Sequence, residues 1–394
     1  MTTEELVAVR LLPEALDFLR ELVEANSYSL NREGVKKNAD LISTRFSNFD
    51  WAEHRIASPV EGTGRHLLLD SGHVGPVVFL ISHLDTVYTA EEQATAGPGW
   101  NPEGERVRGP GVVDNKGGTA MLWLVLRILQ ETAPKTFHAI RWVAAWNAAE
   151  ELLMPDFSVA CLAFAPAPKA ALVFEADNSA TAGTWEVVHW RSGIVRYRLI
   201  CEGRGAHAGN GHEKGQNAIV GLASAILEIS GWTDYGRNTT INVGTVQGGE
   251  STNRVPDLAE ATFEIRFRDP THFAELEARL ASLPATIGCS LRIQKVAEIT
   301  PLDRGADGDR LESNWREAGR ELGLSVSSGG RRGSSDANYF SSHAPTLDGL
   351  GPRGGNMHAI ERRDGSIQIT EYLELDSFAA KAALNARALT RLFP

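Results

Sequence analysis

The chain has 394 residues, of which 39 are Lys or Arg and 50 are Asp or Glu, so its formal net charge is −11. Hydrophobic residues make up 42% and charged residues 23%. This is an ordinary globular composition, which excludes a disordered or collagen-like chain, and the length is enough for two or three domains. The acidic balance argues against a nucleic-acid partner, which would need a basic surface.

The cysteines and the apolar stretches indicate where the protein is found. Cys161, Cys201 and Cys289 form no CxxC pair, which predicts reduced core thiols rather than a disulfide framework or a cysteine zinc site. The richest apolar stretches, residues 76–81 and 121–129, are shorter than the roughly 18 residues of a membrane span. The acidic N-terminus lacks a signal-peptide pattern. We therefore expect a cytoplasmic protein with no membrane partner.

The first part of the chain alternates helical and strand-like patterns. The predicted elements are helices over residues 13–25 and 33–47, strands over 66–70 and 76–81, a helix over 117–131, and strands over 139–147 and 170–175. Apolar residues at helical spacing indicate the helices, and continuous apolar runs indicate buried strands. Strands that alternate with helices predict a mostly parallel sheet covered on both faces.

The pattern changes after about residue 185. The predicted order is a strand over 189–202, a helix over 215–230, strands over 239–246 and 258–268, a helix over 271–282, a strand over 290–296, and later helices over 310–323 and 375–392. The central part matches a ferredoxin-like α+β sandwich. We therefore predict an α/β domain in two parts, residues 1–187 and 300–394, interrupted by an α+β domain over 188–299.

Two loops that follow predicted elements carry candidate metal ligands. His83 and Asp85 stand two apart in SHLDTV after a buried strand, so in extended backbone they face the same way. Taken alone, this pattern is as typical of a structural histidine. Asp114 lies in GPGVVDNKGG, residues 109–118, which opens a helix. That loop is also compatible with a plain helix cap, but its spacing fits neither the P-loop nor the dinucleotide fingerprint.

Further acidic residues follow the next predicted strands. Glu150 and Glu151 are adjacent, and two such carboxylates repel each other unless a cation lies between them or one has a raised pKa. The alternative is a pair of solvated glutamates at a helix start. Glu175 closes the strand AALVFE, and His358 lies in a late loop, GNMHAIE.

Together these residues form a mixed nitrogen and oxygen ligand set, namely His83, Asp114, Glu151, Glu175 and His358. Such a set suits a pair of zinc ions, or cobalt or manganese in their place. The sequence has no GxSxG motif, so metal-activated water is the nucleophile that the residues support best.

These motifs, in this order, resemble the di-zinc metallopeptidases and deacylases that include glutamate carboxypeptidase, acetylornithine deacetylase and succinyl-diaminopimelate desuccinylase. The resemblance covers nearly the whole chain. It implies a zinc-peptidase-like three-layer catalytic domain with an inserted lid and dimerisation domain, and hence a homodimer. It also implies that His83 and Glu175 bind one zinc ion, that Glu151 and His358 bind the other, and that Asp114 bridges them.

The resemblance assigns further roles around the metals. It implies that Asp85 orients His83, that Glu150 is the general base, and that the peptide bond from Asp114 to Asn115 is cis. His66 and several other histidines match no ligand position of the family and are assigned no role.

The inserted domain carries its own motifs. His207 in GAHAG matches the histidine that stabilises the oxyanion in a neighbouring active site. Asn253 in GGESTNRVP and Arg266 in FEIRF match positions that hold the substrate carboxylate, a task that suits a guanidinium. Gly333 and Ser335, in GSSDANY, match a substrate-binding stretch in which the family has threonine instead of Ser335.

The resemblance implies a metal-dependent hydrolase of small molecules that cleaves an amide next to a free carboxylate, like a glutamate carboxypeptidase or a dipeptidase. The segment Trp185–Trp190 replaces a stretch in which a lysine would contact glutamate, so an N-acyl-amino-acid deacylase or an amidohydrolase acting on an aromatic amide is an alternative. A non-catalytic binding protein on the same fold and a nucleotide-binding oxidoreductase are alternatives of other classes.

Overall fold

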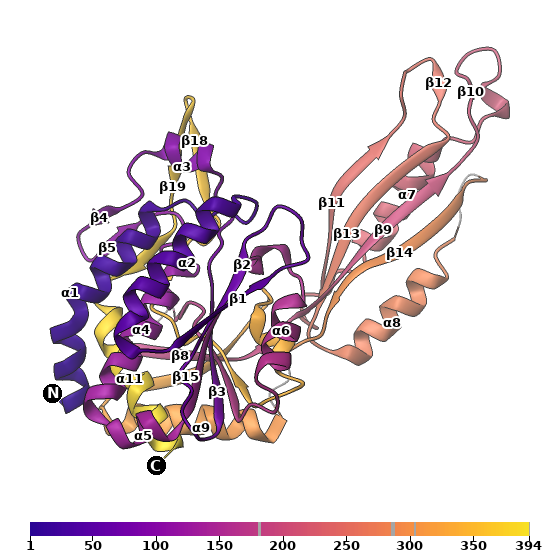
Figure 1. Ribbon diagram of the computed structural model, residues 1–394. Coiled ribbons are helices and arrows are strands. Elements are labelled where there is room, and N and C mark those ends of the chain that lie inside the picture. Colours follow the sequence, from indigo (N-terminus) through magenta and orange to yellow (C-terminus); the bar gives the residue numbers. More distant parts are fainter. Residues whose placement is uncertain (180–182, 285–287, 303–304, 394) are drawn as a thin grey trace. The chain divides into compact units, whose positions relative to one another are not determined.

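The computed structural model describes residues 1–179, 183–284, 288–302 and 305–393 (Figure 1). The chain forms two compact units. Unit 1 comprises Met1–His189, Asp303–Gly330 and Ser335–Pro394, and unit 2 comprises Trp190–Leu302 and Arg331–Ser334. Unit 2 is therefore an insertion into unit 1, and a short later segment of the chain returns to it.

The main sheet of unit 1 has the strand order β1-β2-β6-β3-β7-β16. Its strands are β1 (Ala52–Ala57), β2 (Arg65–Asp70), β3 (Val77–His83), β6 (Arg141–Asn147), β7 (Ala170–Val173) and β16 (Thr346–Leu347). From β6 onward neighbouring strands are parallel, whereas β1 and β2 pair antiparallel. The buried apolar runs thus form the parallel centre of the sheet, as parallel strands covered on both faces require.

Helices cover both faces of this sheet. Successive residues of a strand point to opposite faces. In β3, Val78 and Leu80 join the large core that includes residues of α1 (Thr3–Glu24), α4 (Lys116–Thr132) and α11 (Ser377–Leu392). Phe79 lies on the other face, where its ring centroid is 5.6 Å from that of Phe340 in α10 (Asp336–Phe340). The result is the expected three-layer arrangement.

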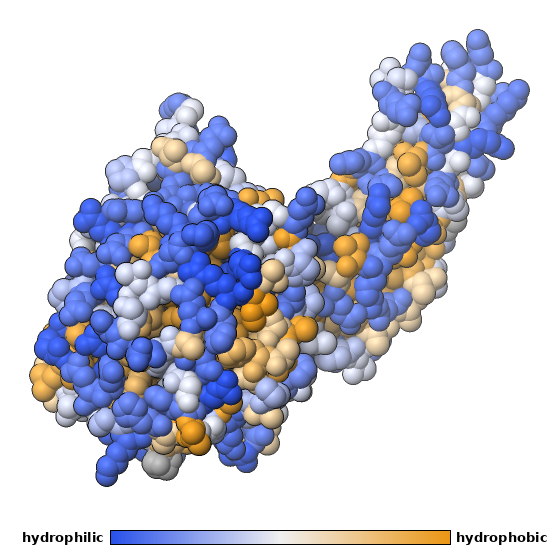
Figure 2. All heavy atoms as spheres, in the orientation of Figure 1, coloured by the Kyte–Doolittle hydropathy of each residue, from blue (hydrophilic) through white to orange (hydrophobic). Residues whose placement is uncertain are grey.

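The remaining elements of unit 1 surround these layers. The helices are α2 (Arg32–Phe46), α3 (Ala90–Ala96), α5 (Pro134–Ala139), α6 (Asp156–Phe164) and α9 (Gly305–Glu321). A small sheet has the order β17-β20-β5-β4, formed by Gly354–Gly355, Tyr372–Glu374, Arg106–Arg108 and Asn101–Glu103. The strands β18 (Ile360–Arg363) and β19 (Ser366–Ile369) form a projecting hairpin (Figure 1). In the space-filling view, hydrophilic side chains dominate the visible surface of unit 1 (Figure 2).

Two elements predicted in the first part of the chain differ from the structure. Helix α1 begins at Thr3 rather than near residue 13, because Thr2 and Glu5 form a capping box and the apolar stripe already includes Leu11. The strand expected over 139–147 begins only at Arg141, since residues 134–139 form the helix α5.

Unit 2 is a sandwich of one sheet and two helices. Its elements are β9 (Gly193–Glu202), α7 (Ala218–Ser230), β11 (Thr240–Gly248), β13 (Leu258–Phe267), α8 (Pro270–Ala281) and β14 (Ser290–Ile299), with a short pair formed by β10 (Ala206–His207) and β12 (Arg254–Val255). The sheet is antiparallel in the order β11-β13-β9-β14. Residues of β13 alternate between buried and more exposed positions, so one face packs on the helices. This confirms the ferredoxin-like order.

The strand expected over 189–202 is in fact two strands. Residues Thr184–Arg191 form β8, which pairs with β15 (Ser325–Arg331) in a separate two-stranded sheet. The chain changes sheets at Ser192, whose amide donates to the carbonyl of Arg331. Continuous hydrophobic alternation hid this break, since both strands share the same period of two. Within the described residues, no helix combines the length and apolar character that crossing a membrane requires.

Candidate metal centre and catalytic site

The expected ligands of unit 1 gather at the carboxyl edge of the parallel strands. Because β3 lies between β6 and β7 and runs parallel to both, residues that end these strands or follow them meet at one edge. His83 is the last residue of β3, Glu151 follows β6 in the short 3-10 helix Glu150–Leu152, and Glu175 follows β7. Asp114 precedes α4, and its peptide bond to Asn115 is cis, as the resemblance implies.

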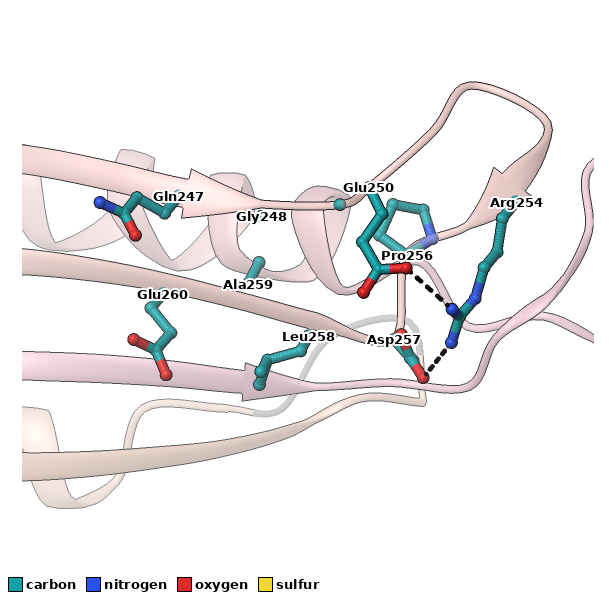
Figure 3. A pocket seen from close by; sticks show the side chains of 10 residues that line it. Gln247, Gly248, Glu250, Arg254, Pro256, Asp257, Leu258, Ala259 and Glu260 are labelled. Atoms are coloured by element: carbon teal, nitrogen blue, oxygen red, sulfur yellow. Dashed lines mark hydrogen bonds and ion pairs between the residues drawn. The ribbon is translucent and has the colours of Figure 1, made fainter.

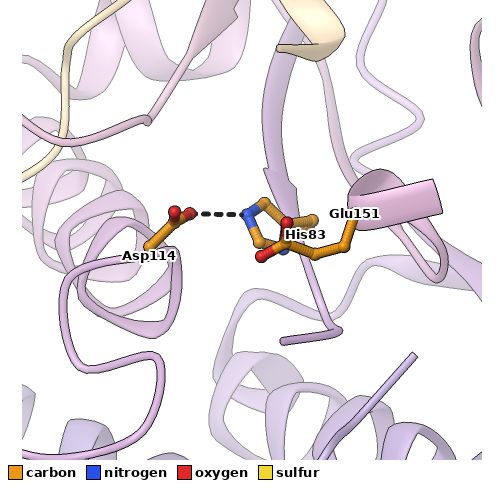
Figure 4. Close-up of side chains that lie close together, drawn as sticks. All are labelled: His83, Asp114 and Glu151. Atoms are coloured by element: carbon orange, nitrogen blue, oxygen red, sulfur yellow. Dashed lines mark hydrogen bonds and ion pairs between the residues drawn. The ribbon is translucent and has the colours of Figure 1, made fainter. Parts of the chain in front are cut away.

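Contacts between side chains join all five expected ligands. The His83 Nε2 atom lies 3.1 Å from Asp114 Oδ1 and 3.7 Å from Glu175 Oε1. The His358 Nε2 atom lies 3.2 Å from Asp114 Oδ2 and 3.1 Å from Glu151 Oε1. Asp114 is therefore central, with each carboxylate oxygen facing a different histidine. Figure 4 shows His83, Asp114 and Glu151 converging from three segments of unit 1.

The charges at this edge fit a bound cation. Ligand atoms of His83, Asp114 and Glu151 all lie within 4.8 Å of one another. Burial raises the pKa of Glu150 well above its usual value, and the neighbouring Glu151 and Glu175 add to the rise. Burial likewise raises the pKa of Glu151. A carboxylate-rich, half-buried cluster is costly without positive charge, and a mixed imidazole and carboxylate set is typical of zinc, cobalt or manganese.

Asp85 holds both His83 and the turn that carries the two glutamates. The Nδ1 atom of His83 donates to the Asp85 carbonyl at 3.0 Å, which leaves the lone pair of Nε2 directed at the ligand cluster. The Asp85 carboxylate accepts the amides of Glu150 and Glu151, at 3.1 and 3.3 Å, and the hydroxyl of Ser29, at 2.6 Å. Asp85 is expected to orient His83, and in the structure it also binds the turn that carries Glu150 and Glu151.

Glu371 and Tyr88 support the loop of Asp114, and no sequence pattern indicated this role. Glu371 is fully buried, and its carboxylate accepts the amides of Gly111, Val113 and Asp114 and the hydroxyl of Tyr88 at 2.8 Å. Burial raises its pKa to about 7. These bonds fix the loop that presents Asp114. No local pattern indicated this, because Glu371 stands in TEYLE, far from the loop in sequence.

Ser335 and its neighbour Asp336 lie in unit 1 and are buried. The Ser335 hydroxyl donates to Asp348 at 2.8 Å and accepts the amide of Ala337 as the cap of α10. Asp336 accepts the side-chain amide of Asn147 at 2.9 Å. The hydroxyl of Ser335 is therefore engaged within unit 1.

The remaining expected residues lie in unit 2. His207 is exposed, and its Nδ1 atom accepts the amides of Gly209 and Asn210, at 3.0 and 3.1 Å. In the neutral ring the hydrogen is therefore on Nε2, which is available as a donor. Asn253 lies close to His207, since the Asn253 carbonyl accepts the amide of Ala208, the residue that follows His207.

Ion pairs of Arg254 support the loop that carries Asn253. Arg254 lies 3.1 Å from Glu250 and 2.9 Å from Asp257, beside a groove of about 360 Å³ (Figure 3). These pairs are exposed, and each contributes about 0.2–1 kcal/mol at most.

Arg266 and Gly333 lie at another part of unit 2. The Nε atom of Arg266 donates to Glu264 at 2.7 Å, and Nη1 lies 3.4 Å from the Arg332 carbonyl. The Gly333 carbonyl accepts from Arg191 at 3.2 Å. Glu264 partly neutralises Arg266, so an anion that binds there competes with an existing partner.

The tryptophans behind the aromatic alternative pack against arginines. Trp185 is 5% exposed and lies under Arg353 of unit 1, with 5.0 Å from Cζ to the ring centroid. Trp190 lies under Arg268 of unit 2, at 4.4 Å. These contacts give both rings a packing role.

Comparisons with known proteins identify relatives of the whole chain. The model of peptidase family M28 matches residues 69–192, and that of the peptidase dimerisation domain matches 189–288. The chain is 30% identical to a succinyl-diaminopimelate desuccinylase of Methylorubrum extorquens, over 82% of this chain and 87% of that protein. It is 24% identical to carboxypeptidase G2 of a Pseudomonas species, over 96% of this chain and 89% of that protein.

A solved structure shares the fold. The M20 family metallo-carboxypeptidase Sso-CP2 from Sulfolobus solfataricus superposes with a TM-score of 0.72 at 15% identity, over 97% of this chain and 99% of that one. The fold and the matches together define a metal-dependent hydrolase of the peptidase and deacylase class. The chain belongs to the family that includes succinyl-diaminopimelate desuccinylase and carboxypeptidase G2.

Proposed function

We propose that this protein is a two-zinc hydrolase that cleaves an amide bond next to a free carboxylate, in the manner of a glutamate carboxypeptidase or a dipeptidase. The observation that carries the proposal is the position of Asp114 between two histidines, each of which also contacts a glutamate. His83 and Glu175 would hold one ion, His358 and Glu151 the other, and Asp114 would bridge them. Bound metals would supply a Lewis acid and an acidified water; cobalt or manganese would serve the same ligands.

Glu150 is the proposed general base. It stands beside the proposed ligand Glu151, and burial raises its pKa well above the usual value. A raised pKa suits a carboxylate that takes a proton from water and returns it to a departing amine. Asp85 fixes the backbone of Glu150 through its amide, so the base is held in place before substrate binds.

Unit 2 would supply substrate contacts. The donor tautomer of His207 suits the stabilisation of an oxyanion, and Asn253 lies in the turn directly before β12, the strand that pairs with β10. Arg266 would bind the substrate carboxylate, with Gly333 close to it in the same unit. Ser335 would act by capping the helix that begins at Asp336.

We also propose a homodimer through unit 2. Strand β11 is an edge of the sheet, and most of its residues are exposed, so its backbone can pair with a second strand. On α7, the apolar side chains of Ile219, Val220 and Leu227 are 39%, 47% and 77% exposed. A two-fold axis would bring the same edge strand and the same apolar helix face of two copies together. The cysteines are buried and lie outside disulfide bonds in the described part of the chain, which supports the proposed cytoplasmic location.

A second candidate is an N-acyl-amino-acid deacylase. It is favoured by the match to a desuccinylase, which is 30% identical over 82% of this chain. The same metal centre and base would serve both reactions, and the acyl pocket would decide between them.

A panel assay tests the proposal. The metal-reconstituted protein is offered N-acyl amino acids, dipeptides and aromatic-acyl glutamates, with a chelator-treated sample as the control. Cleavage that is lost with chelator and restored by zinc is expected. Preference for acyl amino acids would favour the deacylase. Cleavage that persists after complete metal removal would refute the two-metal reaction.

A further inference from the structure

His66 lies directly beneath the turn that carries the proposed base. It belongs to β2, and the adjacent Leu67 pairs with Trp146 of β6, so His66 stands beside the end of β6. Its side chain is 1% exposed. The ring is therefore fixed next to the residues that lead from β6 into Glu150 and Glu151.

The two ring nitrogens of His66 bind the two ends of one segment. The Nδ1 atom accepts the amide of Ala148, at 3.1 Å, and Ala148 directly follows β6. The Nε2 atom lies 2.8 Å from Oδ2 of Asp156, the first residue of α6. The segment 148–156, which contains Glu150 and Glu151, is thus closed at both ends by one imidazole.

The hydrogen-bond partners of His66 determine which of its ring nitrogens carries the hydrogen. A backbone amide can only donate, so Nδ1 must be the acceptor and the hydrogen resides on Nε2, which donates to Asp156. Burial by itself would raise the pKa of Asp156, but its hydrogen bond with His66 helps to hold the pKa below the usual value. The ring of Phe157 packs against His66, with 5.2 Å between centroids.

His66 completes a set of bonds to consecutive amides. The amide of Ala149 donates to the side chain of Asn147, and those of Glu150 and Glu151 donate to Asp85. With His66 on Ala148, each amide from 148 to 151 is bound by a buried side chain. A turn held at every amide leaves its two carboxylates little freedom.

We propose that His66 is a positioning residue for hydrolysis, which holds Glu150 and Glu151 in place by bonding both ends of the segment 148–156. The proposal rests on the proposed function for the role of Glu150, but not on any particular substrate. Displacement of a reacting group by about 1 Å can lower a rate by about 100-fold. Partners that orient metal ligands typically contribute 10–100-fold in affinity or activity, as an order of magnitude.

The test compares three variants with the wild type. His66→Leu removes both bonds, whereas His66→Asn places an amide oxygen near the position of Nδ1 and can still accept from Ala148. The control is His73→Leu, since His73 is a half-buried histidine three residues beyond the other end of β2, bonded to the carbonyls of Phe137 and Ile140. For each protein, kcat, KM, zinc affinity and hydrogen exchange of the Ala148 amide without metal are measured.

In His66→Leu, kcat is expected to fall about 10–100-fold, with KM within about twofold, weaker zinc binding and faster exchange at Ala148. His66→Asn should recover most of kcat and of the protection at Ala148. His73→Leu should lower stability while leaving kcat and zinc affinity unchanged. A folded His66→Leu with unaltered kcat and exchange would overturn the proposal, as would a His66→Asn that is equally impaired.

A further variant covers a failure to fold. If His66→Leu does not fold, Asp156→Asn keeps the ring but weakens its second bond, and an intermediate loss of kcat and amide protection is expected; unchanged values would count against the proposal. If the wild type cleaves no substrate of the panel, the proposed function fails, while exchange at Ala148 and zinc affinity still decide the role of His66.

Discussion

The buried ion pair between Lys381 and Asp177 offers a sharp test of the packing of unit 1. The Lys381 Nζ atom lies 2.8 Å from Asp177 Oδ2, and both side chains are 0% exposed. Nζ also donates to the Glu186 carbonyl, while Asp177 accepts the amides of Ser179 and Glu186. The change Lys381→Met would leave a carboxylate buried without its countercharge.

The expected loss follows from these contacts. Removing one member of a buried pair costs roughly 3–5 kcal/mol. The two backbone amides continue to bind Asp177, which places the loss near the lower end, at about 3 kcal/mol. Adding Asp177→Asn removes the stranded charge and should restore about 2 kcal/mol.

The pH dependence of this loss has a definite sign. Burial by itself raises the pKa of Asp177, but the charge and hydrogen bond of Lys381 outweigh it, so the folded pKa is below the unfolded value. The pair therefore stabilises the fold at pH values above the unfolded pKa of the aspartate, about 3.9. This stabilisation is lost as the pH falls through the folded pKa of Asp177. In Lys381→Met the folded pKa rises above the unfolded value, and the folded state gains a proton on acidification. The difference between the proteins should therefore narrow from pH 7 toward pH 4.

The assay is urea unfolding of the metal-free protein, followed by tryptophan fluorescence. The signal reports chiefly on unit 1, since of the tryptophans only Trp190 and Trp232 lie in unit 2. The control is Lys36→Met, because Lys36 forms a 2.7 Å pair with Asp40 that is 58% and 44% exposed. It should cost no more than about 0.5 kcal/mol. A loss below about 1 kcal/mol in Lys381→Met, or a difference that widens on acidification, would refute the reasoning.

Three further outcomes are expected. Glu150→Gln should keep its zinc content, measured by elemental analysis, while kcat falls about 10²–10⁴-fold; near-normal turnover would reject Glu150 as the base. His207→Ala should lower kcat about 10²–10³-fold with unchanged metal content, and an unaltered rate would make His207 structural. Arg141→Gln removes the 2.7 Å contact to Asp70. Burial by itself raises the pKa of Asp70, but the bonds from Arg141 hold that pKa below its usual value. The variant should therefore lose about 1 kcal/mol of stability at pH 7, and this loss should shrink toward pH 3 when stability is measured against pH. A loss that stays constant with pH would contradict the pairing.

Much of the fold followed from local patterns. The apolar runs of β3 and β6 predicted the centre of the sheet, because strands buried on both faces must be apolar throughout. The alternation along β13 predicted a sheet with one covered face. Local patterns placed the start of α1 near Pro13, although the helix continues through this proline to the capping box at Thr2. They also merged β8 with β9, since Ser192 does not change the hydrophobic period.

The sequence by itself determined which residues are candidate metal ligands, because histidines and carboxylates at strand ends are local features and their order matched a family. The tertiary structure decided what holds them. Glu371 binds the loop of Asp114, and Asp85 and His66 bind the turn of Glu150. These partners are distant in sequence and meet only when the sheet forms. A hydrogen bond between buried groups depends on distance and direction, which no spacing along the chain specifies.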